Sequence, residues 1–146
     1  MEAIGYLLKN AQQALRATMD AALRDLGVTT PQYAVLAFLE ESPGLSSAQL
    51  ARRAFVTPQT MNRIVANLQA AGLIERAQSP DAGRALDATL SAQGSRVLAE
   101  CHRRVQQVEA QMVAGLTTPE QQHLADLLHR CASALGHRRQ RPSTGT

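Results

Sequence analysis

The chain has 146 residues, 45% hydrophobic and 18% charged, which is the composition of one globular domain or one subunit of an assembly rather than of a disordered protein. No apolar run approaches the roughly 20 residues that a membrane-spanning helix needs, and the first residues lack the basic and apolar regions of a signal peptide. We therefore expect a cytoplasmic protein with no membrane partner. Aromatic residues make up only 3%, which argues against a base-stacking surface for single-stranded nucleic acid.

The net charge of +3 is distributed unevenly along the chain. Residues 46–84 contain five arginines against only Glu75 and Asp81, whereas residues 1–45 contain more acidic than basic groups. All but one of the basic residues are arginine, which suits bidentate contacts to phosphate or guanine. A GC-rich genome would produce the same bias, so this alternative stays open.

The first three predicted elements are helices. Apolar residues recur every three or four positions through the first segment and predict one long amphipathic helix that Gly27 ends. Thr30, followed by proline, is predicted to cap a second helix, which stops at the Ser-Pro-Gly sequence of residues 42–44. Ser46 and Gln49 fit a capping box at the start of a short third helix.

A fourth helix is predicted to begin after Thr57 and to run to Ala71, with Gly72 closing it. Its apolar residues fall within one stripe of about 100°; they are Met61, Ile64, Val65 and Leu68. The opposite face is polar and has no acidic group; it carries Gln59, Thr60, Asn62, Arg63 and Asn67. Gln and Asn can pair with adenine, and Arg with guanine, in the major groove of DNA. A face that only meets solvent is the alternative, but such a face more often carries Glu and Lys.

After Gly72 the pattern alternates with a period of two. Residues 73–77 and 86–90 are predicted strands, and the turn sequence at 79–83 joins them into a small β-hairpin. Arg84 follows this turn, where a wing would cross a phosphate backbone or enter a minor groove, and Asp81 is predicted to hold it in place. The alternative is an ordinary exposed turn with one weak charge pair.

Two more helices complete the predicted elements. Ser91 can cap a helix whose apolar residues are spaced by three and four, a seam suited to packing on another helix; they are Leu98, Cys101, Val105, Val108 and Met112. Thr118, with a proline after it, and Gln121 predict a capping box that opens the last helix. Residues 137–146 are polar and are predicted to be a frayed tail.

The order helix, helix, short turn, helix and β-hairpin over residues 30–90 is that of a winged helix-turn-helix. The chain resembles the MarR family of bacterial transcription regulators over about residues 5–136. The resemblance is densest in VTTPQYAVLAFLE (28–40), LARRAFVTPQTMNRIVANLQAAGLIER (50–76) and DAGRALDATLSAQG (81–94). It implies an obligate homodimer in which the N- and C-terminal helices of two subunits interlock.

The expected fold is therefore mainly α with a small β-hairpin wing. A winged helix-turn-helix module at 30–90 is flanked by dimerisation helices at 1–29 and 91–136, and a tail follows at 137–146. The resemblance places the family's recognition helix on residues 57–71 and its wing-tip arginine on Arg84. The predicted DNA-binding residues are Ser47, Thr57, Pro58, Gln59, Thr60, Asn62, Arg63, Asn67 and Arg84.

The wing differs from the family's pattern. Members commonly carry acidic residues where this chain has Ser79 and Ala82, and they often have further basic residues in the wing. Here the wing offers Arg84, with Asp81 close to it in sequence. The recognition helix is therefore expected to supply most of the affinity for DNA.

The predicted function is sequence-specific transcriptional regulation by a ligand-responsive repressor, a homodimer that binds double-stranded DNA at a pseudo-palindromic operator. Many relatives release DNA when a small phenolic or aromatic acid binds, so such an effector is a further expected partner. The sequence does not identify its site; Tyr6, Arg16, Tyr33 and the histidines are candidates. A non-specific architectural or protein-docking winged helix is the alternative function.

The sequence contains no motif of an enzyme, and we expect neither a catalytic residue nor a cofactor. Cys101 and Cys131 form neither a disulfide framework nor a zinc pattern; both lie on apolar seams, where unreactive thiols are the usual case and a redox switch is the alternative. His123 and Asp126 suggest a metal site, but no histidine pair has the spacing of a helical zinc clamp, so no metal is predicted.

Overall fold

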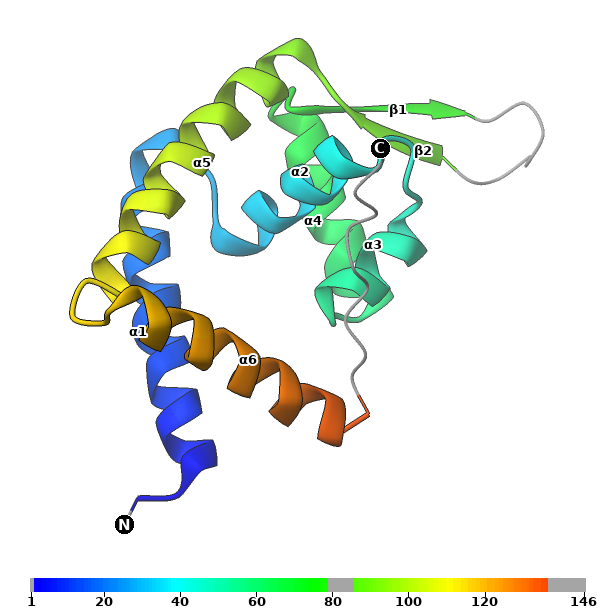
Figure 1. The fold of residues 1–146 in the computed structure, drawn as a ribbon. Helices are drawn as coiled ribbons and strands as arrows, with labels where there is room; N and C mark the ends of the chain where they lie inside the picture. Colours follow the sequence, from blue (N-terminus) through cyan, green and yellow to red (C-terminus); the bar gives the residue numbers. More distant parts are fainter. Residues whose placement is uncertain (1, 79–85, 137–146) are drawn as a thin grey trace, which may run out of the picture. The chain divides into compact units, whose positions relative to one another are not determined.

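The computed structural model describes residues 2–78 and 86–136 of the chain. Two compact units are present, Met1–Val108 and Glu109–Thr146, and each is described by itself. The elements in chain order are α1 (Ile4–Leu23), the 3-10 turn η1 (Arg24–Leu26), α2 (Thr30–Glu41), α3 (Ser47–Ala54), α4 (Pro58–Ala70), β1 (Ile74–Gln78), β2 (Leu86–Leu90), α5 (Ala92–Met112) and α6 (Thr118–Ala134) (Figure 1). The predicted fold class, mainly α with a β-hairpin, is confirmed. In the described part of the chain, no helix is long and apolar enough to span a membrane.

The start of α2 differs by one residue from the prediction. The N-cap is Thr29, not Thr30: its backbone is extended, and its hydroxyl accepts a hydrogen bond from the Gln32 N–H. The Gln32 side chain in turn accepts from the Thr29 N–H at 3.0 Å, which completes a capping box. Thr30 instead donates its backbone N–H, at 3.2 Å, and its hydroxyl to Asp20 of α1. The carboxylate of α1 thereby fixes the first turn of α2.

The predicted starts of α3 and α4 are confirmed, whereas α4 ends at Ala70, one residue before the predicted Ala71. Ser46 and Gln49 form the capping box of α3, and Thr57 caps α4 by accepting from the Thr60 N–H. The long first helix ends earlier than predicted, at Leu23, and η1 follows before Gly27 reverses the chain with a φ of 70°. This left-handed conformation suits glycine because a side chain would be strained there.

The strands β1 and β2 pair antiparallel, with Ile74 opposite Leu90 and Arg76 opposite Ala88. The segment before α3 joins the same sheet through a bridge between Leu45 and Ala88. The Gly44 N–H donates to the Ala88 carbonyl at 2.9 Å, and the Ala88 N–H donates to the Leu45 carbonyl at 3.2 Å. The base of the hairpin is therefore tied by main-chain bonds to the chain that enters the helix-turn-helix.

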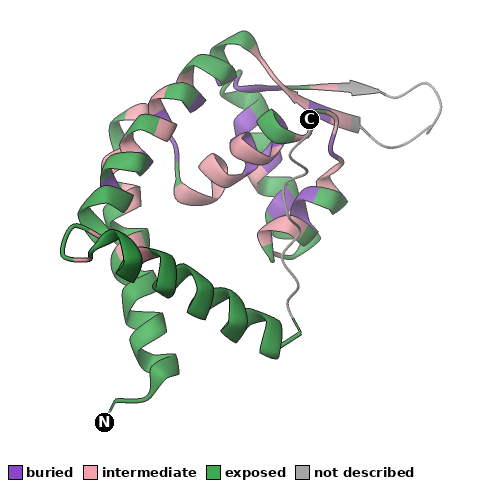
Figure 2. Ribbon diagram, viewed as in Figure 1, coloured by how far each residue is buried: buried purple, intermediate pink, exposed green. Residues whose placement is uncertain are grey.

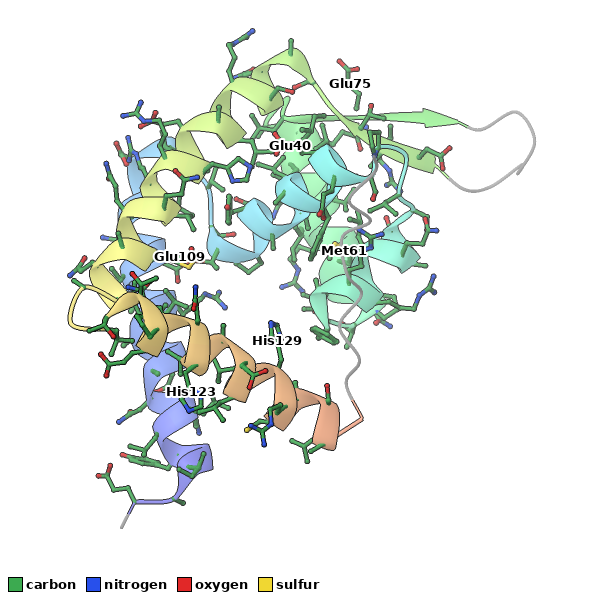
Figure 3. The ribbon with its side chains drawn as sticks, in the orientation of Figure 1. Glu40, Met61, Glu75, Glu109, His123 and His129 are labelled. Atoms are coloured by element: carbon green, nitrogen blue, oxygen red, sulfur yellow. The ribbon has the colours of Figure 1, made fainter. Side chains whose placement is uncertain are left out.

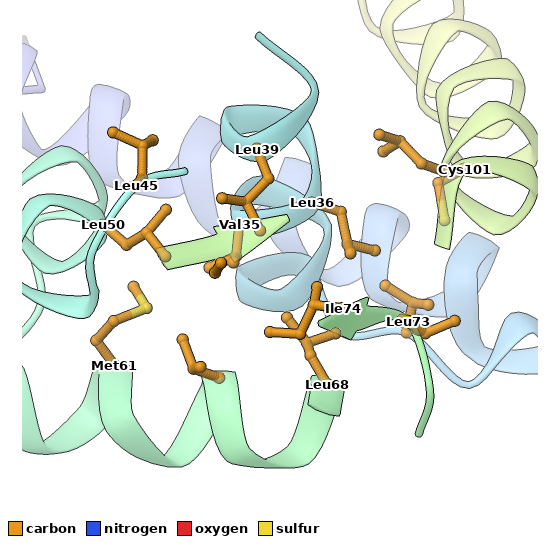
Figure 4. Packing of buried hydrophobic residues seen from close by; sticks show 14 of the residues in the cluster. Val35, Leu36, Leu39, Leu45, Leu50, Met61, Leu68, Leu73, Ile74 and Cys101 are labelled. Atoms are coloured by element: carbon orange, nitrogen blue, oxygen red, sulfur yellow. The ribbon is translucent and has the colours of Figure 1, made fainter. Parts of the chain in front are cut away.

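One hydrophobic core joins the helices and strands of the first unit (Figure 4). The predicted stripe of α4 is confirmed, since Met61, Val65 and Leu68 are buried and Ile64 packs against them partly buried. The predicted seam of α5 is buried from Leu98 to Val108, whereas Met112 is exposed. Other large members of the core are Leu23, Val35, Leu36, Leu39 and Leu50. Burial of these apolar side chains fixes the position of α4 and leaves its polar face outside.

Gly94 lies where α5 approaches the chain that follows α4. Ser91 caps this end of the helix, since its hydroxyl accepts from the Gly94 N–H at 2.9 Å and donates to the Gly72 carbonyl at 2.6 Å. A Cβ atom on Gly94 would lie 1.9 Å from the Leu73 carbonyl oxygen. Only glycine fits this close approach of two backbones.

The second unit contains the end of α5, a short connection and α6. The capping box of α6 is formed by Thr117 and Glu120, so the predicted pair Thr118 and Gln121 was wrong by one residue. Thr117 keeps the extended backbone of an N-cap, which leaves Thr118 as the first helical residue. Gln121 instead donates to the carbonyls of Val113 and Leu116 within the connection.

Candidate nucleic-acid interface

The outer face of α4 carries several polar side chains. The ribbon of α4 carries both exposed and buried residues (Figure 2). The five predicted polar residues are all exposed, while the opposite face is buried in the core; they are Gln59, Thr60, Asn62, Arg63 and Asn67. Met61, on the buried face, is labelled in Figure 3. None of the ion pairs between described residues involves Arg63, so its guanidinium has no carboxylate partner among them. The structure thus brings together amide, hydroxyl and guanidinium groups without a carboxylate.

The N-terminus of α4 is exposed and capped. Thr57 and Pro58 are both exposed. The Thr57 hydroxyl donates to the Thr60 hydroxyl at 3.0 Å and accepts from the Thr60 N–H at 3.2 Å. The first N–H groups of a helix have no partner within it and carry partial positive charge, so this end favours an anion such as phosphate.

The remaining predicted residues fall in two places. Ser47 is the first residue of α3, is partly buried, and accepts a hydrogen bond from Arg76 of β1 at 3.1 Å. Sequence reasoning missed Arg76, although the alternation of β1 puts it on the same side as buried Ile74 and opposite exposed Glu75. Arg84 and Asp81 lie outside the described residues.

The candidate effector residues of the first unit lie in separate places, whereas His137 lies outside the described residues. Tyr33 of α2 hydrogen-bonds His102 of α5 at 2.8 Å, and the other ring nitrogen of His102 lies 3.0 Å from Glu40 (labelled in Figure 3). Tyr6 is exposed on α1, and Arg16 pairs with Asp20 one turn further along the same helix. Tyr33 and His102 thus connect α2 to α5.

A second polar connection joins α5 to the end of α1. Arg104 donates to the Ala22 carbonyl at 2.9 Å and to the carboxylates of Asp25 and Glu100. The hydrogen bond from Arg104 lowers the pKa of Asp25, and the same pair raises the pKa of Arg104. This guanidinium satisfies the carbonyl of Ala22 at the end of α1, where such groups otherwise lack partners.

The two cysteines are free thiols in different settings. Cys101 is buried in the core, and burial raises the pKa of its thiol, which disfavours the reactive thiolate. Cys131 is exposed on α6. Among the described residues, no group of three histidine, cysteine or acidic side chains could hold a metal ion; His123 and His129 are labelled on α6 in Figure 3.

The helix-turn-helix of α3 and α4, followed by a β-hairpin, is the arrangement of a winged helix. In helix-turn-helix proteins the second helix lies in the major groove and its N-terminal residues contact the bases. Here that helix presents a polar, acid-free face and an exposed, capped N-terminus. Fold and surface therefore define a winged helix-turn-helix protein of the DNA-binding class.

Comparison with known proteins gives the family. The model of the MarR family matches residues 26–85. The HTH-type transcriptional repressor Rv2887 of Mycobacterium tuberculosis is 42% identical over 130 residues, which cover 89% of this chain and 94% of that protein. The chain belongs to the MarR family, and it is a DNA-binding transcriptional regulator.

Solved structures agree with this assignment. Rv2887 in complex with DNA matches with a TM-score of 0.77 and 38% identity, covering 90% of this chain and 98% of that one. Rv2887 has also been solved in complex with salicylic acid, with a TM-score of 0.73, 40% identity and coverage of 90% and 97%. A probable transcriptional regulator from Pseudomonas aeruginosa matches with a TM-score of 0.81 and 32% identity, covering 89% and 97%.

Proposed function

We propose that this protein is a ligand-responsive transcriptional repressor that binds a pseudo-palindromic operator as a homodimer in the cytoplasm. The observation that carries the proposal is the exposed, acid-free polar face of α4 beside its exposed N-terminus. Such a face can donate and accept hydrogen bonds at base edges without repelling the phosphates. The proposal assigns the protein no catalytic reaction.

Within this proposal, residues of α4 read the bases and the flanking groups bind the backbone. Arg63 is assigned to a guanine, and Thr57, Gln59 and Thr60 to bases or phosphates near the start of the helix. The full set is Ser47, Thr57, Pro58, Gln59, Thr60, Asn62, Arg63, Asn67 and Arg84, with Asp81 supporting Arg84. Two such modules related by two-fold symmetry would contact half-sites about 10 bp apart.

The exposed apolar side chains of the helices outside the module support a homodimer. At the start of α1, Ile4 is 71% and Leu8 50% exposed, and on α6, Leu127 is 38% exposed. Neighbouring exposed residues are Tyr6, Leu7, Leu124 and Leu128. Apolar faces of this kind mark interaction surfaces, and a second copy offers the same faces in return. The division into dimerisation helices at 1–29 and 91–136 and a module at 30–90 stays a prediction.

A small aromatic acid is the proposed effector. The similarity to Rv2887, which has been solved both with DNA and with salicylic acid, supports this choice. The measurement is displacement of a labelled operator by salicylic acid, compared with its non-aromatic analogue cyclohexanecarboxylic acid. Displacement by salicylic acid alone is expected; equal displacement by both acids, or by neither, contradicts an aromatic-acid effector.

The assignment of Arg63 tests the proposed base readout. Arg63→Ala is expected to cost about 1–3 kcal/mol on an operator selected by the wild-type protein and to relax one base position in each half-site. Arg103→Ala removes the same charge from α5 and is the control, with little expected change. The measurement is fluorescence anisotropy on the operator and on a scrambled duplex. Unchanged discrimination in Arg63→Ala would contradict base readout by this side chain.

A further inference from the structure

Two neighbouring serines at the start of α3 have different hydrogen-bond partners. The Ser46 hydroxyl accepts from the Gln49 N–H at 3.2 Å and so caps the helix. The Ser47 hydroxyl lies outside this capping box and accepts from the Arg76 guanidinium of β1 at 3.1 Å. The second serine is therefore held by the wing rather than by its own helix.

Main-chain bonds hold both partners of this contact in register. Arg76 lies opposite Ala88 in the hairpin, and Ala88 also bridges to Leu45, two residues before Ser47. Exposed Glu75, labelled in Figure 3, lies next to Arg76 on the opposite side of the alternating strand. The guanidinium thus reaches α3 from a fixed point at the base of the wing.

The hydrogen bond between Arg76 and Ser47 leaves the hydroxyl proton of Ser47 unused. A guanidinium has no acceptor, so Ser47 Oγ must accept the bond, and the hydroxyl proton of Ser47 remains available for another acceptor. No hydrogen bond found between described residues uses that proton. A phosphate oxygen is an acceptor, and hydroxyl groups of this kind donate to phosphates in protein–DNA complexes.

The guanidinium itself is not fully satisfied. Arg76 Nε is buried and has no hydrogen-bond partner in the structure, and none of the ion pairs between described residues includes Arg76. Its positive charge is therefore not neutralised by a described carboxylate. A cation bonded to Ser47 Oγ polarises that hydroxyl and makes it a stronger donor to an anion.

We propose that Arg76 is a positioning residue for DNA binding, which holds the Ser47 hydroxyl so that its O–H donates to a phosphate oxygen of duplex DNA. This proposal rests on the proposed function. Arg76 acts through Ser47, and the bond also joins the base of the wing to α3. Neither residue contributes to base readout, so the contact adds affinity without sequence preference.

The test is the affinity of the full-length chain for duplex DNA at a fixed salt concentration of about 150 mM. Loss of a hydrogen bond to a charged group lowers affinity by about 10-fold, so Ser47→Ala should lower the affinity by about 100-fold across two half-sites. Because the hydroxyl is neutral and releases no counterion, the salt slope of this variant should stay close to that of the wild type. Ser47→Thr keeps the hydroxyl and should retain the wild-type affinity.

A double-mutant comparison separates positioning from direct contact. Arg76→Gln should lower the affinity in the wild-type background and should lower it no further in the Ser47→Ala background. Arg103→Gln removes the same charge from α5 and controls for long-range attraction. The thermal unfolding midpoint and the molecular mass of each variant, measured in parallel, identify those that are folded and dimeric.

Each other outcome overturns the proposal. An equal loss of affinity from Arg76→Gln in both backgrounds, together with a lower salt slope, means that Arg76 contacts phosphate directly. A lowered unfolding midpoint with an unchanged affinity means that the bond only stabilises the fold. Failure of the wild-type protein to bind any duplex would reject the proposed function as well, whereas wild-type binding with unchanged variant affinities rejects the role of Arg76 alone.

Discussion

The winged helix-turn-helix and helix α6 both place apolar residues at helical spacing, but they differ in what covers those residues. In α4, Met61, Val65 and Leu68 are buried by their own chain. In α6, no residue that the structure describes is buried, and Leu124, Leu127 and Leu128 are each more than a third exposed. The same pattern therefore produces a core in one region and an exposed apolar face in the other.

This difference assigns two requirements of the proposed function to two surfaces, DNA binding to the polar face of α4 and subunit association to the apolar face of α6. The first unit buries its apolar residues in one core, to which α1 and α5 also contribute, and α4 presents outside this core the polar face that we propose binds DNA. The apolar face of α6 remains in contact with water unless another protein surface covers it, and burial there would stabilise an assembly. Substitutions in the core of the first unit should therefore lower the free energy of unfolding, whereas substitutions in the apolar face of α6 should weaken the association of subunits.

The largest effect is expected at the apolar face of α6. Leu127→Asp places a charge in the proposed interface and should shift the dimer to monomer at micromolar concentration, with a loss of at least about 100-fold in operator affinity. The measurements are light scattering after gel filtration and anisotropy. Gln122→Asp adds the same charge on the other face of α6 and should remain dimeric. A Leu127→Asp variant that stays dimeric would contradict the proposal that the apolar face of α6 forms the interface.

A large effect on folding is expected inside the first unit. Gly94→Ala drives a methyl group into the Leu73 carbonyl, and because both groups are backbone, the helix start or the preceding loop must move. We expect a loss of unfolding free energy of about 3 kcal/mol or more. Urea unfolding at fixed protein concentration measures it, with Ala99→Ser at an exposed site of the same helix as control. A loss below about 1 kcal/mol would contradict the close packing.

A smaller, pH-dependent effect is expected at the contact between α1 and α2. The hydrogen bond from the Thr30 hydroxyl lowers the pKa of Asp20, so the ionised carboxylate stabilises the folded state above the ordinary pKa of about 3.9. Asp20→Ala should cost about 1 kcal/mol at neutral pH. The difference from wild type should shrink as pH falls through the ordinary value toward the lowered one.

Urea unfolding at neutral pH and near pH 3 measures this difference. Asp126→Ala, which breaks only a long exposed pair with Arg130 at 3.7 Å, is the control and should have little effect at either pH. A difference between wild type and Asp20→Ala that is the same at both pH values would contradict the role of the ionised carboxylate.

The smallest effect is expected at the turn between α3 and α4. Phe55 ends α3 with a φ of 56° and is 80% exposed, so its side chain gains little from burial while its backbone is in the left-handed region. Because Asn tolerates the left-handed conformation better than Phe, Phe55→Asn should stabilise the module by up to about 1 kcal/mol. Phe55→Ala, which keeps a Cβ without that tolerance, is the comparison. Thermal unfolding in which Phe55→Asn is less stable than Phe55→Ala would contradict this interpretation.

The sequence predicted well those features that depend on residues close together in the chain. The burial of Met61 and the exposure of Arg63 follow from helical periodicity, and the caps at Ser46 and Thr57 follow from side chains three residues apart. Where two threonines precede a proline, at 29–30 and 117–118, the motif fits both residues, and the prediction chose the wrong one each time. Local patterns fix such an end only to within one residue.

The features that sequence missed depend on contacts between distant segments. Arg76 and Ser47 are 29 residues apart, and their hydrogen bond exists because the hairpin bridges to the chain before α3. The approach of Gly94 to Leu73 likewise depends on how α5 packs. The recognition-helix face could be predicted because one helix carries it, whereas the positioning contact needs the assembled fold.

The most direct test of the central claim is selection of bound duplexes from a random DNA library at about 150 mM salt, with the wild-type protein and Leu127→Asp in parallel. We predict a two-fold symmetric motif with half-sites about 10 bp apart for the wild type and no such motif for the variant. Recovery of unselected sequence by the folded wild-type protein, in the absence of effector, would contradict sequence-specific binding by α4 and favour an architectural or protein-docking role.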